Sequence, residues 1–272
     1  MSGRNASLHR PDTGASDLTV ARYYDDKTRR IIDKYGPGPR IHFHSGIHAR
    51  AVPNGASQDE IRGALVTAQE NLVHEVSRRV PAQSILDIGC GLGGAALILS
   101  EKARVKAITI VPSHVEHMHG LGIDAELRDA HDLAGLPQHD AAVAIESSCY
   151  FDRPRWFSEL RRVLPVGACV HVVDCFVGSP RVAARFDDYW KTTIGTLESY
   201  DDASRDFVRV HTRDYGPDTL AFWTLSIRWS ELAARRGDRE RLTRSVSEHT
   251  WLRASIELGA IRYLYVVYRR ER

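Results

Sequence analysis

The sequence predicts an α/β fold in which a mostly parallel sheet is covered by helices on both faces. Two observations carry this prediction. From residue 84 onward, short apolar segments alternate with segments of helical periodicity, which is the order that a parallel, doubly covered sheet requires. A glycine-rich turn joins the first apolar segment to the first helical one. With 272 residues, the chain is long enough for one large domain or a core with an insertion.

The segment before the sheet is predicted to be helical. Val20–Tyr35 has the pattern of a helix, and the glycines and prolines of residues 36–39 end it abruptly. Gln58–Val80 is predicted as a second helix, because Ser57 is a good N-cap and Glu60 completes a capping box three residues later. We expect this part of the chain to form a lid.

The sheet segment is predicted from short apolar runs bounded by polar residues or glycine. The expected strands span residues 84–88, 105–111, 141–146 and 169–175. The expected helices span residues 93–102, 113–119 and 153–164.

The last part of the chain is predicted to add aromatic-rich helices and two further strands. Arg181–Leu197 and Pro217–Arg236 have helical patterns, and we expect them to form a cap over the C-terminal edge of the sheet. Phe207–Thr212 alternates like a strand, and Arg262–Tyr268 is predicted as another.

These assignments divide the chain into four parts. The N-terminal part is polar and rich in Ser, Gly and Asn, which predicts a disordered leader and not a signal peptide. The leader, the helical lid, the sheet core, and the cap with the last strands span residues 1–17, 18–80, 81–178 and 179–272.

Composition argues against several classes of partner. The 37 Lys and Arg residues nearly balance the 35 Asp and Glu residues, so bulk charge favours neither a nucleic acid nor a membrane surface. No stretch approaches the roughly 20 apolar residues of a membrane span. The cysteines form no C-x-x-C pair and lie in apolar segments, which predicts core residues of a protein in the reducing cytoplasm. They are Cys90, Cys149, Cys169 and Cys175.

The glycine-rich turn is the most informative motif. Residues 87–94 read Asp-Ile-Gly-Cys-Gly-Leu-Gly-Gly. Because the turn follows a strand and opens a helix, its N–H groups would face a ligand at the positive end of that helix. Gly89, Gly91 and Gly94 also satisfy the dinucleotide pattern G-x-G-x-x-G, which alone is a weak signal. A tight turn without a ligand is the structural alternative.

Two features favour S-adenosylmethionine (SAM) over a dinucleotide. Asp87 stands two residues before the first glycine, where its carboxylate can accept bonds from the methionine amino group, directly or through water, but would repel a pyrophosphate. The second strand ends at Val111 without the ribose-binding acid of dinucleotide sites. We therefore predict SAM as cofactor and S-adenosylhomocysteine as product. Asp129 is the candidate acceptor for the adenine amino group, and a turn role for Asp129 and Asp132 stays open.

These motifs resemble the class I SAM-dependent methyltransferases, and among them the C-methyltransferases of the sterol, tocopherol and geranyl diphosphate group. The similarity covers about residues 69–176 and includes Ile85–Gly91, Ile145–Ser148 and Trp156–Gly167. The segment from Tyr23 to Gly46 resembles the lid of bacterial enzymes that methylate isoprenoid double bonds, such as the teleocidin-type terpenoid C-methyltransferases. The resemblance implies a Rossmann-like sheet of seven strands.

The resemblance also implies a set of cofactor contacts. The family's Thr-Leu-Ser-Pro stretch stands here as Thr109–Pro112, and its ribose-contacting Gln falls at His114, which can still donate or accept one bond. The expected cofactor-binding residues are Tyr24, Asp87, Gly89, Gly91, Gly93, Thr109, His114, Asp129 and Ala130.

By the same resemblance Glu146 is the catalytic base. An electron-rich alkene attacks the sulfonium methyl group directly and becomes a tertiary carbocation that must lose a proton. A carboxylate at the C-terminal end of the fourth strand can stabilise that cation and take the proton. A carboxylate that only caps the following turn, Ser147–Ser148, is the alternative.

Aromatic side chains are a second device suited to a carbocation, because each ring face attracts a cation by roughly 0.5–2 kcal/mol. Packing is the alternative role for each of them. The histidines of the lid, at positions 42, 44 and 48, lack a completing acid, so we expect hydrogen bonding and no metal site. Mg²⁺ is expected only together with a diphosphate substrate. The predicted acceptor-binding residues are His44, Tyr150, Trp190, Tyr200, Phe222 and Trp223, with Tyr24 and Phe43 as further aromatic candidates.

Three functions are weighed. The first is C-methylation of an isoprenoid alkene, either a prenyl diphosphate or a prenylated metabolite such as a geranylated indole, and cyclisation can follow. The second, O- or N-methylation of a secondary metabolite, usually needs a His base near the fourth or fifth strand, and His171 is expected in mid-strand and buried. The third, a SAM-binding scaffold, needs neither Glu146 nor an aromatic cap. We expect the first, and leave open whether the chain forms a homo-oligomer.

Overall fold

The protein is described here by a computed structural model that covers residues 23–24, 27–235 and 239–272. Residues 27–35 form a helix that ends at Tyr35, where the Gly-Pro segment was predicted to end it. The predicted leader and the predicted start of this helix at Val20 lie outside the described residues.

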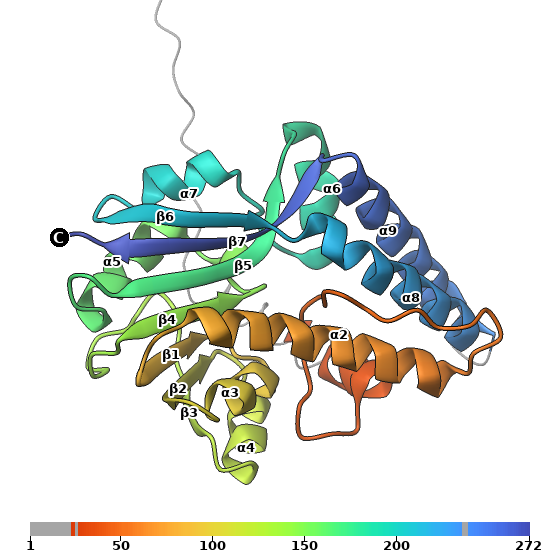
Figure 1. Ribbon diagram of the computed structural model, residues 1–272, viewed down its shortest axis with the longest axis horizontal. Helices are drawn as coiled ribbons and strands as arrows, with labels where there is room; N and C mark the ends of the chain where they lie inside the picture. The colour runs from red at the N-terminus through yellow and green to blue at the C-terminus, as the bar shows by residue number, and fades with distance from the viewer. Residues whose placement is uncertain (1–22, 25–26, 236–238) are drawn as a thin grey trace, which may run out of the picture.

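A seven-stranded mixed sheet forms the centre of the molecule (Figure 1). Its strand order is β3-β2-β1-β4-β5-β7-β6, in which β1 to β5 are parallel and β7 is antiparallel to both of its neighbours. The predicted Rossmann-like, mostly parallel sheet is therefore confirmed. The strands are β1 (Ser84–Ile88), β2 (Arg104–Thr109), β3 (Asp124–Leu127), β4 (Ala141–Ile145), β5 (Cys169–Val177), β6 (Phe207–Asp214) and β7 (Ile261–Arg270).

Helices cover both faces of this sheet. The capping box at the start of α2 is present, since Glu60 N donates to Ser57 Oγ and Ser57 N donates to Glu60 Oε2. The described helices are α2 (Gln58–Arg79), α3 (Gly94–Leu99), α4 (Pro112–Gly120), α5 (Arg153–Val163), α6 (Pro180–Trp190), α7 (Leu197–Ala203), α8 (Gly216–Ala234) and α9 (Arg239–Glu257), with a 3₁₀ turn at Ser148–Tyr150.

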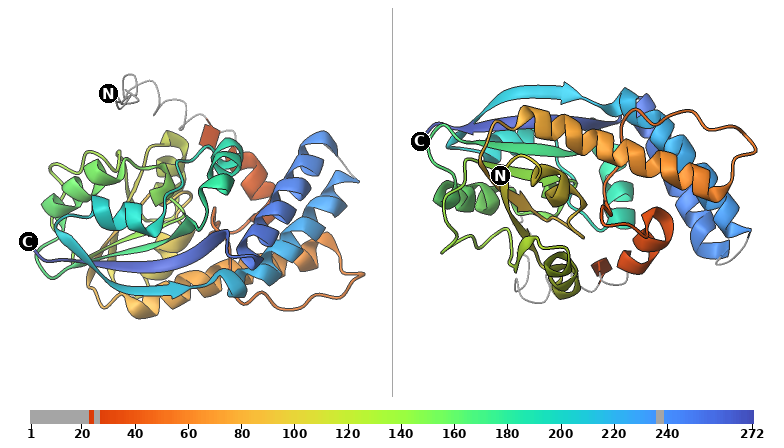
Figure 2. Two further views of the ribbon diagram at one scale, coloured as in Figure 1. Left: turned by 90° about the horizontal axis from the view of Figure 1, so that it is seen from above. Right: turned by 60° about the horizontal axis from the view of Figure 1, so that its bottom comes forward.

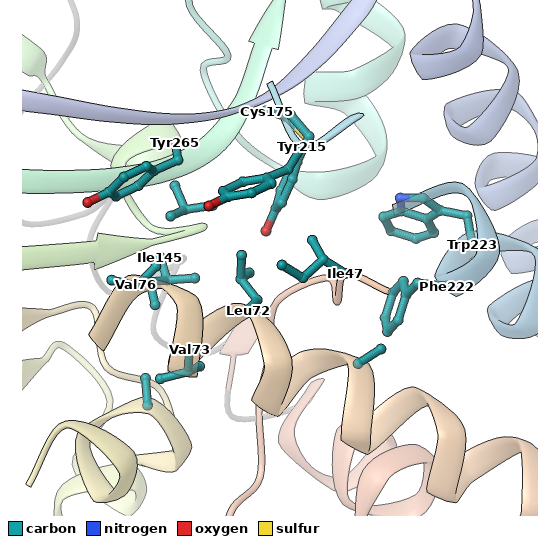
Figure 3. Packing of buried hydrophobic residues seen from close by; sticks show 14 of the residues in the cluster. Ile47, Leu72, Val73, Val76, Ile145, Cys175, Tyr215, Phe222, Trp223 and Tyr265 are labelled. Atoms are coloured by element: carbon teal, nitrogen blue, oxygen red, sulfur yellow. The ribbon is translucent and has the colours of Figure 1, made fainter. Parts of the chain in front are cut away.

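Each face of the sheet has its own apolar core. On one face, α2 and α3 pack with α8 against strands β4, β5 and β7 (Figure 3). Leu72 and Val76 of α2 point toward Tyr215 and Tyr265, which come from the β6–β7 side. On the other face, α5 and α7 pack around the fully buried Trp156. Packing on both faces holds the parallel strands in place, and with them the edge of the sheet at which their carboxyl ends lie.

The cap lies beyond the carboxyl ends of β4 and β5. Figure 1 shows α8 and α9 side by side at that end of the molecule, with α6 beside them. In the views of Figure 2 the helix of residues 27–35 lies between the sheet and this hairpin, and Lys34 contacts Ser226 of α8. The lid helix and the cap therefore meet over the strand ends.

Several sequence-based assignments differ from the structure. The helix predicted over residues 181–197 is shorter than expected: α6 ends at Trp190, Lys191 adopts a left-handed conformation, and a separate helix, α7, begins at Leu197 after the N-cap Thr196. Helix α9 was not predicted, because its few buried apolar positions are scattered in a polar sequence. Strand β3 was also missing from the predicted strands; of its four residues only Ala125 is buried.

Candidate active site

Two adjoining cavities open at the carboxyl ends of β1, β4 and β5. The smaller measures about 120 Å³ and contains the glycine loop, and the larger measures about 670 Å³ and lies under the cap. Four residues line both cavities and form the wall between them: Tyr24, Phe43, Glu146 and Tyr150. This arrangement suits a cofactor in one cavity and an acceptor molecule in the other.

The glycine loop has room for backbone only. Gly89 and Gly91 have φ of +75° and +55°, a left-handed conformation that favours glycine. A Cβ at Gly89 would lie 2.5 Å from Ser147 Cβ, and one at Gly91 would lie 2.8 Å from the ring of Phe43. Both glycines line the smaller cavity. Gly93 does not line it; it precedes α3 and packs against Met118 and Ile123.

Four other predicted cofactor residues also line the smaller cavity: Thr109, His114, Asp129 and Ala130. His114 lies 2.7 Å through Nε2 from Thr28 Oγ1 of the lid helix. Asp129 Oδ1 accepts a hydrogen bond from His131 N at 2.8 Å. The structure thus brings the residues predicted for the ribose and adenine to one place.

Asp87 lies behind the loop and does not line either cavity. It is 2% exposed, and its Oδ2 has no hydrogen-bond partner among the described residues. Burial raises the pKa of Asp87 to about 7. A buried carboxylate oxygen without a partner is unusual, and a cationic ammonium group near the loop would supply the missing interaction.

Glu146 follows β4 directly and is held by two donors. Its Oε1 accepts hydrogen bonds from Ser45 N at 2.6 Å and from Tyr263 Oη at 2.7 Å. Its φ of +48° is a left-handed conformation that is uncommon outside glycine. No described residue bonds to Oε2, so that oxygen is available to an acceptor in the larger cavity. Sequence reasoning missed both donors, which lie 101 and 117 residues away in the chain.

A second carboxylate, Asp174 on β5, also lines the larger cavity and was not predicted. Its oxygens accept hydrogen bonds from Ser148 Oγ at 2.7 Å, Cys149 N at 2.9 Å and Cys175 N at 2.8 Å. Burial raises the pKa of Asp174 to about 6. These bonds tie the turn that carries Tyr150 to the sheet.

The larger cavity has the predicted aromatic walls. Tyr150, Trp190, Phe222 and Trp223 all line it, as do Tyr24 and Phe43. Tyr200 does not: it is fully buried in the core on the α5 face, where its hydroxyl bonds Ser148 and its ring contacts Arg153. The prediction for Tyr200 was therefore wrong in its placement, because α7 was not recognised as a separate helix. The sequence missed Phe186, Tyr189 and Trp229 as wall residues.

The lid histidines separate. His44 lines the larger cavity, and its Nε2 lies 3.0 Å from His42 Nδ1. His48 instead lies beside α8, where its Nδ1 is 3.6 Å from Asp218 Oδ1. In residues 23–24, 27–235 and 239–272, no three His, Cys, Asp or Glu side chains form a metal-binding group. His171 is buried in β5, bonds Tyr265, and lines neither cavity.

Comparisons with known proteins agree with this geometry. Residues 86–171 match the family described as "Methyltransferase domain". The chain is 27% identical over 235 residues to a geranyl diphosphate 2-C-methyltransferase of Streptomyces lasalocidi, covering 76% of this chain and 78% of that protein. It is also 27% identical over 173 residues to 24-methylenesterol C-methyltransferase 3 of Arabidopsis thaliana, covering 59% of this chain and 46% of that protein.

Solved structures share the fold. A crystal structure of geranyl diphosphate C-methyltransferase from Streptomyces coelicolor A3(2), in complex with Mg²⁺, geranyl-S-thiolodiphosphate and S-adenosyl-L-homocysteine, superimposes with a TM-score of 0.78 at 19% identity and covers 96% of this chain and 100% of that one. The [4+2]-cyclase SpnF superimposes with a TM-score of 0.70 at 21% identity, covering 94% and 96% of the two chains.

The sheet order, the glycine loop and the match of residues 86–171 to the methyltransferase domain together give this chain the fold of a class I SAM-dependent methyltransferase. The residues present fit SAM as the cofactor: two glycines line the smaller cavity without room for a Cβ, and Asp87 has a buried oxygen without a partner among the described residues. When bound, SAM supplies an electrophilic methyl group.

Proposed function

We propose that this protein methylates an alkene carbon of an isoprenoid molecule and that Glu146 removes a proton from the resulting carbocation. One observation carries the proposal: the Glu146 carboxylate lies in the wall between the two cavities, with one oxygen held and the other free of described partners. The relatives named as geranyl diphosphate and sterol C-methyltransferases support the substrate class.

The residues of the wall have complementary roles in this proposal. Ser45 N–H and Tyr263 O–H orient the Glu146 carboxylate, so that Oε2 faces the acceptor. Because the side chain is already ordered, no conformational entropy is lost to position it in each turnover. Tyr24 and Tyr150 lie with ring centroids 5.4 Å apart in an edge-on arrangement. Their faces attract a developing cation while offering it no nucleophile. The surrounding indole and phenyl groups exclude water, which would otherwise capture the cation.

Glu146→Gln tests the proposal. The amide oxygen still accepts hydrogen bonds from Ser45 and Tyr263 but cannot take a proton. We expect turnover on a prenyl alkene to fall by about 100- to 10,000-fold, the usual contribution of a general base. Binding of S-adenosylhomocysteine, measured by calorimetry, should change less than about threefold, because Glu146 is not one of the predicted cofactor contacts and the product has lost the methyl group that Glu146 would face.

Glu75→Gln is the matched control. Glu75 also accepts a tyrosine hydroxyl, from Tyr215 at 3.2 Å, and lies on α2 outside both cavities. That variant should keep its turnover. Near-normal turnover of Glu146→Gln on an alkene would remove Glu146 from the mechanism.

O-methylation is the second candidate, since one relative is named a probable tocopherol O-methyltransferase of Oryza sativa subsp. japonica, at 27% identity over 170 residues. It requires a base that can reach a hydroxyl group. His171, the candidate base near the fifth strand, lines neither cavity, whereas His44 and His249 line the larger one. Loss of turnover in His44→Phe, together with full turnover in Glu146→Gln, would favour this alternative.

A further inference from the structure

A group of buried polar atoms in the larger cavity has no role in the proposed methylation. Lys34, near the end of the lid helix, is 8% exposed, and its Nζ donates to Ser226 Oγ of α8 at 2.5 Å. Ser226 Oγ lies 3.2 Å from His249 Nδ1 of α9. Lys34 and His249 both line the cavity. The lid helix and the two cap helices thus meet at one buried amine.

Lys34 forms no ion pair with a described carboxylate. Its Nζ lies over the rings of Tyr35 and Trp229, 5.2 and 5.5 Å from their centroids. Burial lowers the pKa of Lys34 to about 7. The charged and titratable groups that line the cavity on the elements around it are Lys27, Arg30, Asp33 and Tyr35 on its own helix, Arg62 on α2, and Arg241, Arg244 and His249 on α9.

Two further donors line the same cavity without partners. Trp223 and Trp229 are 6% and 7% exposed, and the Nε1 of each has no hydrogen-bond partner among the described residues. Positions 223, 226 and 229 are three apart on α8 and therefore share one helix face. Figure 3 shows the indole nitrogen of Trp223 on the side of the ring away from the α8 ribbon. An indole N–H can donate but not accept.

We propose that this part of the cavity binds an oxyanion carried by the acceptor molecule, with Lys34, Trp223 and Trp229 as its donors. The proposal rests on the proposed function, because the same cavity would hold the isoprenoid chain. A buried ammonium without a counterion is costly, and buried N–H groups without partners add to that cost. A carboxylate or phosphate group has enough lone pairs and charge to satisfy all three donors, whereas a hydroxyl group does not.

Three acceptor analogues with the same ten-carbon chain test the proposal: geranyl diphosphate, geranic acid and geraniol. Binding is measured by calorimetry with S-adenosylhomocysteine present. We expect at least one anionic analogue to bind about tenfold or more tightly than geraniol. Lys34→Met should remove this preference, a loss of roughly 10- to 100-fold for a charged hydrogen bond. Whether the diphosphate or the carboxylate binds more tightly identifies the source of the oxyanion.

Proton uptake provides a second readout. An anion beside Lys34 favours the ammonium form, so binding at pH 8 should take up protons, seen as a dependence of the binding enthalpy on the ionisation enthalpy of the buffer. Lys34→Arg should keep the preference for anions but lose the uptake, since a guanidinium is charged at every accessible pH. His249 would still be present in that variant, so the comparison isolates Lys34.

Two controls keep the outcome decisive. Lys106→Met removes a lysine on β2 that pairs with Asp124 outside both cavities, and it should change nothing. If Lys34→Met fails to fold, Trp229→Phe removes one donor and keeps a ring; Trp156→Phe, which removes an unpartnered N–H outside both cavities, is its control.

Geraniol binding as tightly as both anions, or an unchanged preference in Lys34→Met or in Trp229→Phe, overturns the oxyanion proposal. Failure to methylate any isoprenoid alkene, with anion binding intact, would instead overturn the proposed function.

Discussion

At the scale of single residues, Glu146 has both a strained backbone conformation and the carboxylate proposed as the catalytic base. A left-handed backbone at a residue other than glycine costs of the order of 1–3 kcal/mol and persists where its surroundings enforce it. Here Glu146 N donates to Val173 O at 2.7 Å, and Ser45 and Tyr263 hold the carboxylate. The strained conformation turns the side chain toward the cavities and away from the path of β4.

Asp87 yields a prediction at the same scale. Its pKa is raised to about 7, so the folded protein holds a proton there that the unfolded chain loses above its ordinary pKa of 3.8. The bound proton therefore stabilises the folded state at low pH. This contribution of Asp87 to the free energy of unfolding is lost as pH rises from about 4 to 7. SAM carries an ammonium group that favours the ionised form. Affinity for SAM should thus rise with pH up to about 7, with release of a proton.

Asp87→Asn tests this linkage. The variant should weaken SAM binding by at least about tenfold at pH 8 and abolish the pH dependence, as measured by titration calorimetry in two buffers. Without SAM it should melt a few degrees above the wild type at pH 8, since it no longer buries a charge. Equal SAM affinity of both proteins at pH 8 would show that Asp87 has no contact with the cofactor, direct or through water.

Which site residues could be found from sequence depended on their distance along the chain. The glycines, Asp87 and Glu146 belong to local strand-to-turn motifs, which can be recognised within a few neighbouring residues of a single sequence. Tyr263 and Lys34 belong to no motif; they reach the cavities because β7 lies beside β5 and the lid helix lies against α8. A single sequence does not contain that pairing.

At the scale of elements, the segment 41–48 shapes the smaller cavity. Phe43 lies against Gly91, and its ring centroid is 5.9 Å from that of Tyr24 and 5.3 Å from that of His114. A space of about 120 Å³ beneath these rings is small for a nucleoside with an amino-acid chain. We infer that the Phe43 side chain moves aside when SAM enters.

Phe43→Ala tests the movement. Removing the ring should raise the rates of SAM association and dissociation together, by about tenfold, with a smaller change in the dissociation constant. Stopped-flow fluorescence measures both rates. Phe151→Ala, which also removes a ring from the smaller cavity but lies outside the segment 41–48, is the comparison. Unchanged rates in Phe43→Ala would mean that Phe43 does not gate the cavity.

At the scale of the whole molecule, most strands and most covering helices were predictable from the sequence, but strand β3 and helix α9 were not. Apolar runs such as β4 and β5 are buried on both faces and stand out in the sequence. Helix α9 buries few apolar residues, because most of its surface faces solvent or the cavity, so its pattern was too weak to predict. No helix in the described part of the chain is long and apolar enough to cross a membrane.

The boundary of the lid provides the last prediction. The lid that the sequence predicts over residues 18–80 extends too far for a segment that can be removed without unfolding the sheet. Ile47 is 1% exposed in the α2 core and its N–H donates to Ala68 O at 3.0 Å, while Gly46 lies so close to α2 that a Cβ would be 2.4 Å from Ala68 C. Residues 41–48 are therefore part of the core, and residues before 41 are the removable lid.

Two truncations separate these parts. Deleting residues 1–40 removes Tyr24 and Lys34 and should abolish turnover, yet leave one cooperative thermal transition in circular dichroism. Deleting residues 1–48 also removes Ile47 and should cost about 2–5 kcal/mol more, as for other buried aliphatic side chains. Because each kcal/mol shifts the melting temperature of a domain of this size by about 2–4 °C, the two proteins should differ by several degrees or more. Full turnover by the shorter deletion would rule out a catalytic lid, and equal melting temperatures would contradict the core role of residues 41–48.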